Sequence, residues 1–277
     1  ASRLAVLRAA DALNYKPSAI ARSLTNQTTH CIGVICATEH VQQSTGYLQA
    51  LEKQLSQHRK HLLLRFASDA HAVTQAVDEL SGGLCDALLV VGARFALPEM
   101  QEEVIFIDCL SAPAALSISC DRRFAAQTAV EYLSRHQRRD IALINFSGGE
   151  AAQETLLGYR EAAENHLIPF NRQRVIEGES SLRLALQKLI NSGVKFNALL
   201  VTDDAQAQEA MAMLHDYQIR VPEQVLVFSL DGSTRLPGQA AIPAIEYSLE
   251  GIARRAVARL LGLGDPSDRV RGTLLCD

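Results

Sequence analysis

The 277-residue sequence has no apolar run that approaches the roughly 20 residues of a membrane-spanning helix. Its first residues carry charges at helical spacing, without the apolar stretch and small-residue cleavage site of an export signal. Hydrophobic residues make up 48% and charged residues 21% of the chain, an ordinary mixture for a globular protein of about two domains. We therefore expect a cytoplasmic protein that does not enter a membrane.

Motifs of catalysis and of metal binding are also missing. No Ser, His and Asp stand in the order of a catalytic triad, and no P-loop or dinucleotide fingerprint is present. The sequence therefore predicts a protein that is not an enzyme, with no cofactor and no metal site. The cysteines form no CxxC pair or other metal-like spacing, so we expect buried, reduced thiols; they are Cys31, Cys36, Cys85, Cys109, Cys120 and Cys276.

The chain has little excess charge overall, but its start has a net positive charge. The formal net charge is -4, yet residues 1–30 hold four basic residues against one acidic residue, whereas the remainder holds 23 basic and 30 acidic residues. Only this first segment suits phosphate. Its second half, YKPSAIARSLTNQTTH, has a Pro-started, weakly helical stretch with a lone Leu24. Because so short a helix is marginal in water, something outside it must hold it.

From Cys31 onward, short apolar runs alternate with longer segments of helical period, which predicts βαβ units on parallel sheets. The expected helices span residues 45–58, 70–80, 124–135, 152–165, 181–192, 205–217 and 249–263. The expected strands are CIGVICA, HLLLRFA, DALLVVGA, VIFIDC, LSISC, DIALINF, RVIEG, ALLVTD, QVLVFSLD and a final RGTLLCD. Two runs of this rhythm need two cores, so the fold class is α/β with two doubly wound parallel-sheet subdomains.

Several stretches, in this order, resemble the LacI/GalR family of bacterial transcription regulators: SRLAVLRAADALNYKPSAIARSL, THCIGVI, GYREAAENHLIP, VTDDAQAQEAM, IRVPEQVLVFSLD and AIPAIEYSLEGIARRAV. The resemblance implies a core like that of type I periplasmic binding proteins, preceded by a hinge segment. Residues 1–29 are then a remnant of the DNA-binding headpiece plus the hinge helix. The N-terminal core subdomain takes residues 30–137 and 247–270, and the C-terminal one takes residues 138–246 and 271–277.

The same resemblance gives the hinge a role on DNA. Hinge helices of two subunits pair in the minor groove and push a leucine, here Leu24, into a base step. The free energy of unstacking that step is offset by the contacts that the bent duplex allows. The alternative is a plain linker whose leucine packs on its own core. The two helices that would read the major groove are not found, so we expect a chain that lacks the first part of the headpiece. The implied DNA-binding residues are Lys16, Ser18, Ala21, Arg22 and Leu24.

The resemblance also implies a small polar effector, a sugar or sugar derivative, in a cleft at the carboxyl ends of the strands. The sequence departs from the family there. The Asn-Pro-Phe-Phe of the family falls on residues 41–44, which removes the aromatic wall, and its clamping arginine falls on Thr155. The family's later acidic positions persist as Asp203 and Asp231. The effector-binding candidates, chosen for hydrogen bonding or stacking, are Gln42, Gln43, Ser44, Phe95, Phe124, Thr155, Asp203 and Asp231.

Simpler interpretations remain open for some of these residues. Asp204 can cap a helix that begins at Ala205, and Asp121 can cap the helix at Phe124. The whole chain is expected to be a homodimeric, DNA-binding repressor that an effector controls through the hinge. Two alternatives are a regulator without a small-molecule effector and a periplasmic-type sugar-binding receptor, since a shared fold does not fix function.

Overall fold

A computed structural model describes Arg8, Ala12 and residues 28–37, 41–93, 95–97, 99–100, 103–109, 112–113, 116–146, 149–179, 181–233, 235, 238–263 and 269–276, without the side chains of residues 41–43. The predicted DNA-binding residues Lys16, Ser18, Ala21, Arg22 and Leu24 lie outside the described residues. Within the described part of the chain, no helix is long and apolar enough to cross a membrane.

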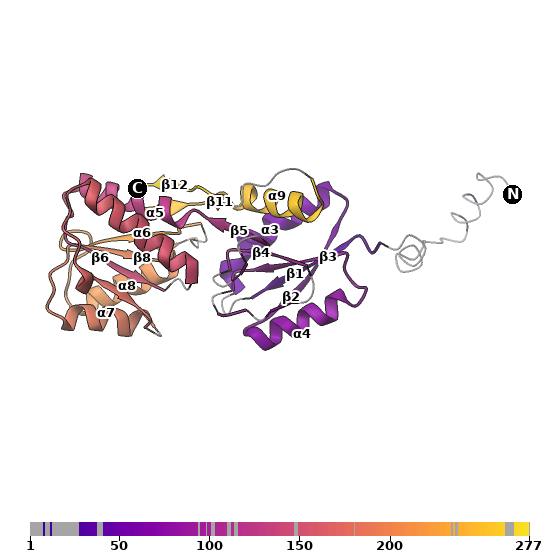
Figure 1. Ribbon diagram of the computed structural model, residues 1–277, viewed down its shortest axis with the longest axis horizontal. Helices are drawn as coiled ribbons and strands as arrows, with labels where there is room; N and C mark the ends of the chain where they lie inside the picture. Colours follow the sequence, from indigo (N-terminus) through magenta and orange to yellow (C-terminus); the bar gives the residue numbers. More distant parts are fainter. Residues whose placement is uncertain are drawn as a thin grey trace.

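Two six-stranded sheets form the centres of two subdomains (Figure 1). The first sheet has the order β11-β5-β4-β3-β1-β2 and is parallel throughout. Its strands are β1 (Cys31–Cys36), β2 (His61–Phe66), β3 (Ala87–Val91), β4 (Val104–Ile107), β5 (Ser117–Cys120) and β11 (Arg269–Val270). The α/β class with doubly wound sheets is thus confirmed.

The second sheet has the order β12-β10-β9-β8-β6-β7, and only β12 runs antiparallel to its neighbour. Its strands are β6 (Ile141–Asn145), β7 (Val175–Glu177), β8 (Ala198–Val201), β9 (Leu226–Ser229), β10 (Ala244–Glu246) and β12 (Thr273–Leu275). Strands β6, β8 and β9 are buried along their whole length. Parallel strands that are covered on both faces are near-continuous apolar runs, which is why the sequence predicted them.

Helices cover both faces of each sheet (Figure 1). Helix α3 (Val41–Gln57) lies beside α9 (Leu249–Leu260) on one face of the first sheet, and α4 (Ala70–Ser81) covers the other face. On the second sheet, α5 (Arg122–Arg135) lies against α6 (Gly149–Asn165), and α7 (Leu182–Asn191) lies against α8 (Asp204–Asp216) on the opposite face.

The helix starts carry the expected polar caps. The carboxylate of Asp121 accepts from the backbone N–H of Phe124 at 3.0 Å, so the predicted cap of α5 is confirmed. The predicted cap of α8 is wrong by one residue, because Asp203 is the cap and accepts from the N–H of Gln206 at 3.0 Å. Asp204 is instead the first helical residue, and its carboxylate pairs with Arg235.

Between its described elements, the chain passes from one subdomain to the other three times. The first passage follows β5, because α5 packs against α6 and β10 of the second subdomain. We therefore place this passage before α5 and not at residue 137. The sequence did not reveal the boundary, because helices of both cores have the same apolar pattern. The second passage joins β10 to α9, and the third joins β11 of the first sheet to β12 of the second.

The last passage is a close one. A Cβ atom added to Gly272, between β11 and β12, would lie 2.3 Å from Cγ2 of Ile245 and 2.9 Å from the carbonyl oxygen of Glu246. Only glycine at position 272 lets the segment between β11 and β12 approach β10 so closely. The six cysteines are free thiols. Cys36 and Cys120 are buried, as predicted, whereas Cys31, Cys85 and Cys109 are half-buried and Cys276 is exposed.

Candidate functional site

The carboxyl ends of central strands from both sheets meet at one buried cluster of charges. Asp108 follows β4, Asp231 follows β9, and Arg122 begins α5. Nη2 of Arg122 donates to Oδ1 of Asp108 at 2.7 Å, and Nη1 lies 3.8 Å from Oδ2 of Asp231. A single arginine therefore links a carboxylate of the first subdomain to a carboxylate of the second. We call Asp108, Arg122 and Asp231 the Arg122 cluster.

The Arg122 cluster is almost fully removed from water. Asp108 and Arg122 are each 8% exposed, and Asp231 is 5% exposed. The guanidinium also lies 5.9 Å from the ring centroid of Tyr247, a cation–π distance. Nη1 of Arg122 and the hydroxyl of Tyr247 are buried without a hydrogen bond to any described residue. Because an unpaired buried donor is costly, the cluster has capacity for one more polar partner.

Burial sets the protonation of the cluster. Burial raises the pKa of Asp231 to about 6, and the negative charge of Asp108 also raises it. The Arg122 cation lowers this pKa, as does the backbone N–H of Ser233, which donates to Oδ1 at 3.0 Å. Burial lowers the pKa of Arg122, but Asp108 and other neighbours raise it well above its ordinary value, so the arginine stays charged. Asp231 thus accepts hydrogen bonds as a carboxylate at neutral pH and protonates in mild acid.

A cavity of about 190 Å³ lies beside the Arg122 cluster, between the subdomains. Arg269 of β11 spans it, with Nη2 3.1 Å from Oε1 of Glu150 and Nη1 3.4 Å from Oε2 of Glu154, both on α6. The cavity is smaller than the ~300–1,000 Å³ of sites for drug-sized ligands, so it suits a small molecule. Its lining mixes charged and polar side chains with small apolar ones: Asp108, Cys109, Ala112, Ser117, Ser119, Cys120, Arg122, Glu150, Ala151, Glu154 and Arg269.

The predicted residues on α3 do not approach this cavity through any described atom. Gln42 and Gln43 lie in the first turn of α3, and their side chains are outside the described part of the structure. Ser44 is buried, and its side chain is hydrogen-bonded to that of Cys36. Burial raises the pKa of that thiol to about 11, against the smaller opposite effect of Ser44. Ser44 is thus occupied inside the first subdomain.

Both predicted stacking faces are already covered. Phe95 packs against the apolar cluster between α4 and the first sheet. The guanidinium of Arg271 lies 5.0 Å from the ring centroid of Phe124 and also approaches Asp121, 3.4 Å from its Oδ2. Thr155 is buried in α6, where its hydroxyl donates to the carbonyl oxygen of Ala151 at 2.9 Å.

Of the predicted effector residues, Asp231 alone belongs to the Arg122 cluster among the residues that the structure describes. Asp203 is engaged in the cap of α8. Sequence reasoning did not select Arg122 or Asp108 as site residues, although Asp108 directly follows β4 and Arg122 comes two residues after the end of β5. A charged residue just after the carboxyl end of a strand, where it faces the other subdomain, was the sequence feature that could have indicated them. The sequence did not show that Arg122 is buried.

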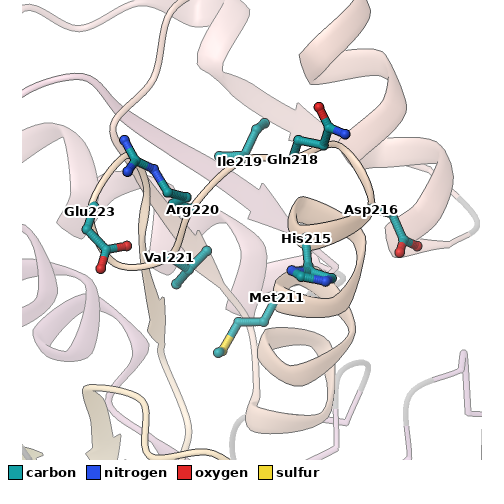
Figure 2. A pocket seen from close by; sticks show the side chains of 8 residues that line it. All are labelled: Met211, His215, Asp216, Gln218, Ile219, Arg220, Val221 and Glu223. Atoms are coloured by element: carbon teal, nitrogen blue, oxygen red, sulfur yellow. The ribbon is translucent and has the colours of Figure 1, made fainter.

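A larger hollow, of about 700 Å³, lies at the opposite edge of the second sheet. Figure 2 shows Met211 and His215 of α8 facing Val221 of the loop that leads to β9. This loop lies at the amino end of β9, whereas Asp231 lies at its carboxyl end. The hollow is therefore a separate surface feature and not part of the inter-subdomain site.

Comparison with known proteins identifies the family. Residues 130–275, just over half of the chain, match the family model described as "Periplasmic binding protein-like domain". The HTH-type transcriptional regulator AscG of Escherichia coli (strain K12) is 25% identical over 282 residues, which cover 95% of this chain and 83% of AscG. The chain belongs to the LacI/GalR family of transcriptional regulators.

Other members of the LacI/GalR family agree. The HTH-type transcriptional regulator GalR of the same E. coli strain is 27% identical over 280 residues, covering 96% of this chain and 81% of GalR. The lac repressor dimer, solved bound to operator and an anti-inducer, has the same fold, with a TM-score of 0.75 at 19% identity over 98% of this chain and 87% of the repressor. This LacI/GalR-family chain is accordingly a transcriptional regulator, and the predicted family is confirmed.

Proposed function

We propose that this protein is a cytoplasmic repressor, without enzymatic activity, that binds operator DNA as a homodimer and releases or engages it when a small polar effector enters the cleft between its subdomains. The Arg122 cluster carries the proposal. It joins Asp108 of the first subdomain to Asp231 of the second, so any molecule that competes for these contacts changes how the subdomains are held together.

The chemistry of the cluster favours a hydroxylated ligand such as a sugar. Nη1 of Arg122 and Oδ2 of Asp231 lie 3.8 Å apart, too far for a direct hydrogen bond. A ligand hydroxyl can donate to Oδ2 and accept from Nη1, so that both atoms gain a hydrogen-bond partner. Such a ligand binds one arrangement of the subdomains better than another, and only that difference shifts the equilibrium between them. The shift then changes the relation between the DNA-binding segments of the two subunits.

One observation favours a second candidate, a regulator without a small-molecule effector. Arg122 already bridges the two subdomains, and the ring of Phe124 is covered by Arg271, so the cleft holds its own partners. The receptor alternative is weaker, because the similar curated proteins are named as transcriptional regulators and not as receptors.

A thermal-shift screen of sugars, sugar phosphates, nucleosides and polyols tests the effector, since a ligand at 100 times its dissociation constant stabilises by about 2.7 kcal/mol. We expect at least one sugar or polyol to raise the Tm of the wild type but not of Asp231→Asn. The matched control is Asp216→Asn, which removes a carboxylate from the separate 700 Å³ hollow and should leave the shift intact. A shift that survives Asp231→Asn would contradict the proposed site, and no shift across the panel would favour the effector-free regulator.

The DNA-binding half of the proposal is tested on the natural gene product. Selection from a random-sequence duplex library should yield a preferred operator, and sedimentation should show a dimer on it. A gene product that enriches no sequence, or that is found outside the cytoplasm, would overturn the repressor assignment.

A further inference from the structure

The segment that carries the positive charge of residues 1–30 joins the first subdomain at the amino edge of its sheet. Thr29 and His30 precede β1, Lys60 precedes β2, and Asp86 precedes β3. These three strands are neighbours, with Cys31 opposite His61 and Ile32 opposite Ala87. The three strand starts therefore lie together, at the edge opposite to the Arg122 cluster.

A single carboxylate gathers the contacts at this edge. Oδ1 of Asp86 accepts from the backbone N–H of Thr29 at 2.6 Å and from its hydroxyl at 2.7 Å. Oδ2 accepts from the backbone N–H of His30 at 3.1 Å and from the ammonium of Lys60 at 2.8 Å. We call Thr29, His30, Lys60 and Asp86 the Asp86 joint.

The backbone around the Asp86 joint is shaped to receive an anion. His30 has φ 57°, the left-handed conformation that a non-glycine residue adopts only when surrounding contacts hold it. Two successive N–H groups aimed at one anion form a nest. The carbonyl oxygen of His30 accepts from the N–H of His61 at 2.7 Å, and that of Cys31 accepts from the N–H of Asp86 at 2.8 Å. His30 and the first residue of β1 are thereby tied to the starts of the two neighbouring strands.

The carboxylate is ionised under all ordinary conditions. Burial raises the pKa of Asp86, but the hydrogen bonds from Lys60 and Thr29 outweigh it and lower the pKa to about 2. Its side chain is 20% exposed and that of Lys60 is 18% exposed, so the charge is only partly screened.

We propose that Asp86 is a positioning residue for DNA binding: its carboxylate fixes Thr29 and His30 on the first sheet and so sets the direction in which the preceding DNA-binding segment leaves the core. The inference rests on the proposed operator binding. The DNA-binding segments of the two subunits bind one duplex together only when the spacing between them matches that of the two half-sites. A flexible Asp86 joint therefore lowers the effective concentration of the second segment at its half-site. A stiff joint also passes a movement of the first subdomain on to the DNA-binding segment.

Four variants of the full-length gene product test the role. Asp86→Asn removes the charge and one acceptor oxygen. Thr29→Val removes the hydroxyl donor, whereas Thr29→Ser keeps it as the conservative variant. Glu79→Gln is the matched control, because it breaks an ion pair of 2.8 Å, to Arg65, on the same subdomain but away from the joint.

Affinity is measured by fluorescence anisotropy for the duplex that the wild type selects and for a scrambled duplex of equal length. We expect Asp86→Asn to weaken binding to the selected duplex at least tenfold and Thr29→Val to weaken it several-fold. Thr29→Ser and Glu79→Gln should stay within twofold of the wild type. Binding to the scrambled duplex should not change, because the charges that meet phosphate are intact.

Amide hydrogen exchange separates positioning from general destabilisation. In Asp86→Asn, the amides of Thr29 and His30 should exchange faster, while those of Ile32, Val34 and Ile35 in β1 keep their protection. Wild-type protection of Thr29 and His30 in Asp86→Asn would overturn the joint itself, whatever the DNA result. Loss of protection throughout β1, or wild-type affinity for the selected duplex, would overturn its positioning role. A wild type that selects no duplex would instead refute the proposed function.

Discussion

Replacement of Arg122 by methionine tests the central charge cluster most directly. Methionine keeps much of the length of arginine but removes the cation that faces the buried carboxylates of Asp108 and Asp231. Removal of one partner from a buried ion pair costs about 3–5 kcal/mol, because the remaining charge is uncompensated. With roughly 2–4 °C of Tm for each kcal/mol in a chain of this size, Arg122→Met should lower the Tm by about 6–20 °C at pH 8.

The loss should shrink in mild acid. Arg122 lowers the pKa of Asp231, so in the variant the pKa of Asp231 rises above the wild-type value of about 6. At pH 5 this carboxyl group is then neutral, and the penalty for its burial is largely relieved. Differential scanning fluorimetry at pH 5 and pH 8 measures both Tm values with the same samples.

Arg123→Met is the matched control for this experiment. Arg123 follows Arg122 on α5, but its partner Glu161 and its own side chain are 30% and 44% exposed. Water screens a pair of this kind, so its loss should change the Tm only slightly. If Arg122→Met melts within 2 °C of Arg123→Met at pH 8, or if its deficit is the same at both pH values, the cluster is not the buried ion bridge described above.

Two further predictions concern stability. The pKa of Asp231 is raised from 3.8 to about 6, so stability from this group is fully present below pH 3.8 and is lost as the pH rises through about 6. Asp231→Asn should therefore flatten the Tm profile between pH 4 and 6.5, and an unchanged slope would refute the assignment. Gly272→Ala should destabilise by about 1–3 kcal/mol through overpacking at the last passage; a Tm equal to that of wild type would show that the passage is looser than its geometry indicates.

The strands were predictable because burial on both faces leaves a direct record in the sequence. The apolar runs of β3 and β9 show no alternation and have few polar residues, so their short length identifies them as buried strands. By contrast, β11 has two residues and one exposed side chain, too few for any pattern. Its place beside β5 depends on the chain's return from the far end, which local sequence does not encode.

The candidate site was predictable only in part. Asp231 was found because it follows a buried strand at a position where the family resemblance expects an acidic residue. Arg122 was not found, because arginine at a helix start is ordinarily solvated, and its burial results from two carboxylates that lie 14 and 109 positions away in sequence. Phe124 was expected to be open because no sequence pattern predicts that Arg271 covers its ring.

The placement of β11 and β12 has a consequence for synthesis on the ribosome. Each sheet receives an outermost strand from residues 269–275, after all its other strands have emerged. Until then, β5 and β10 present unpaired backbone groups along one side, and such open borders recruit strands from other chains. A nascent polypeptide that stalls before residue 269 therefore exposes two unpaired strand edges at once. Chaperones should associate with it for longer than with the finished protein.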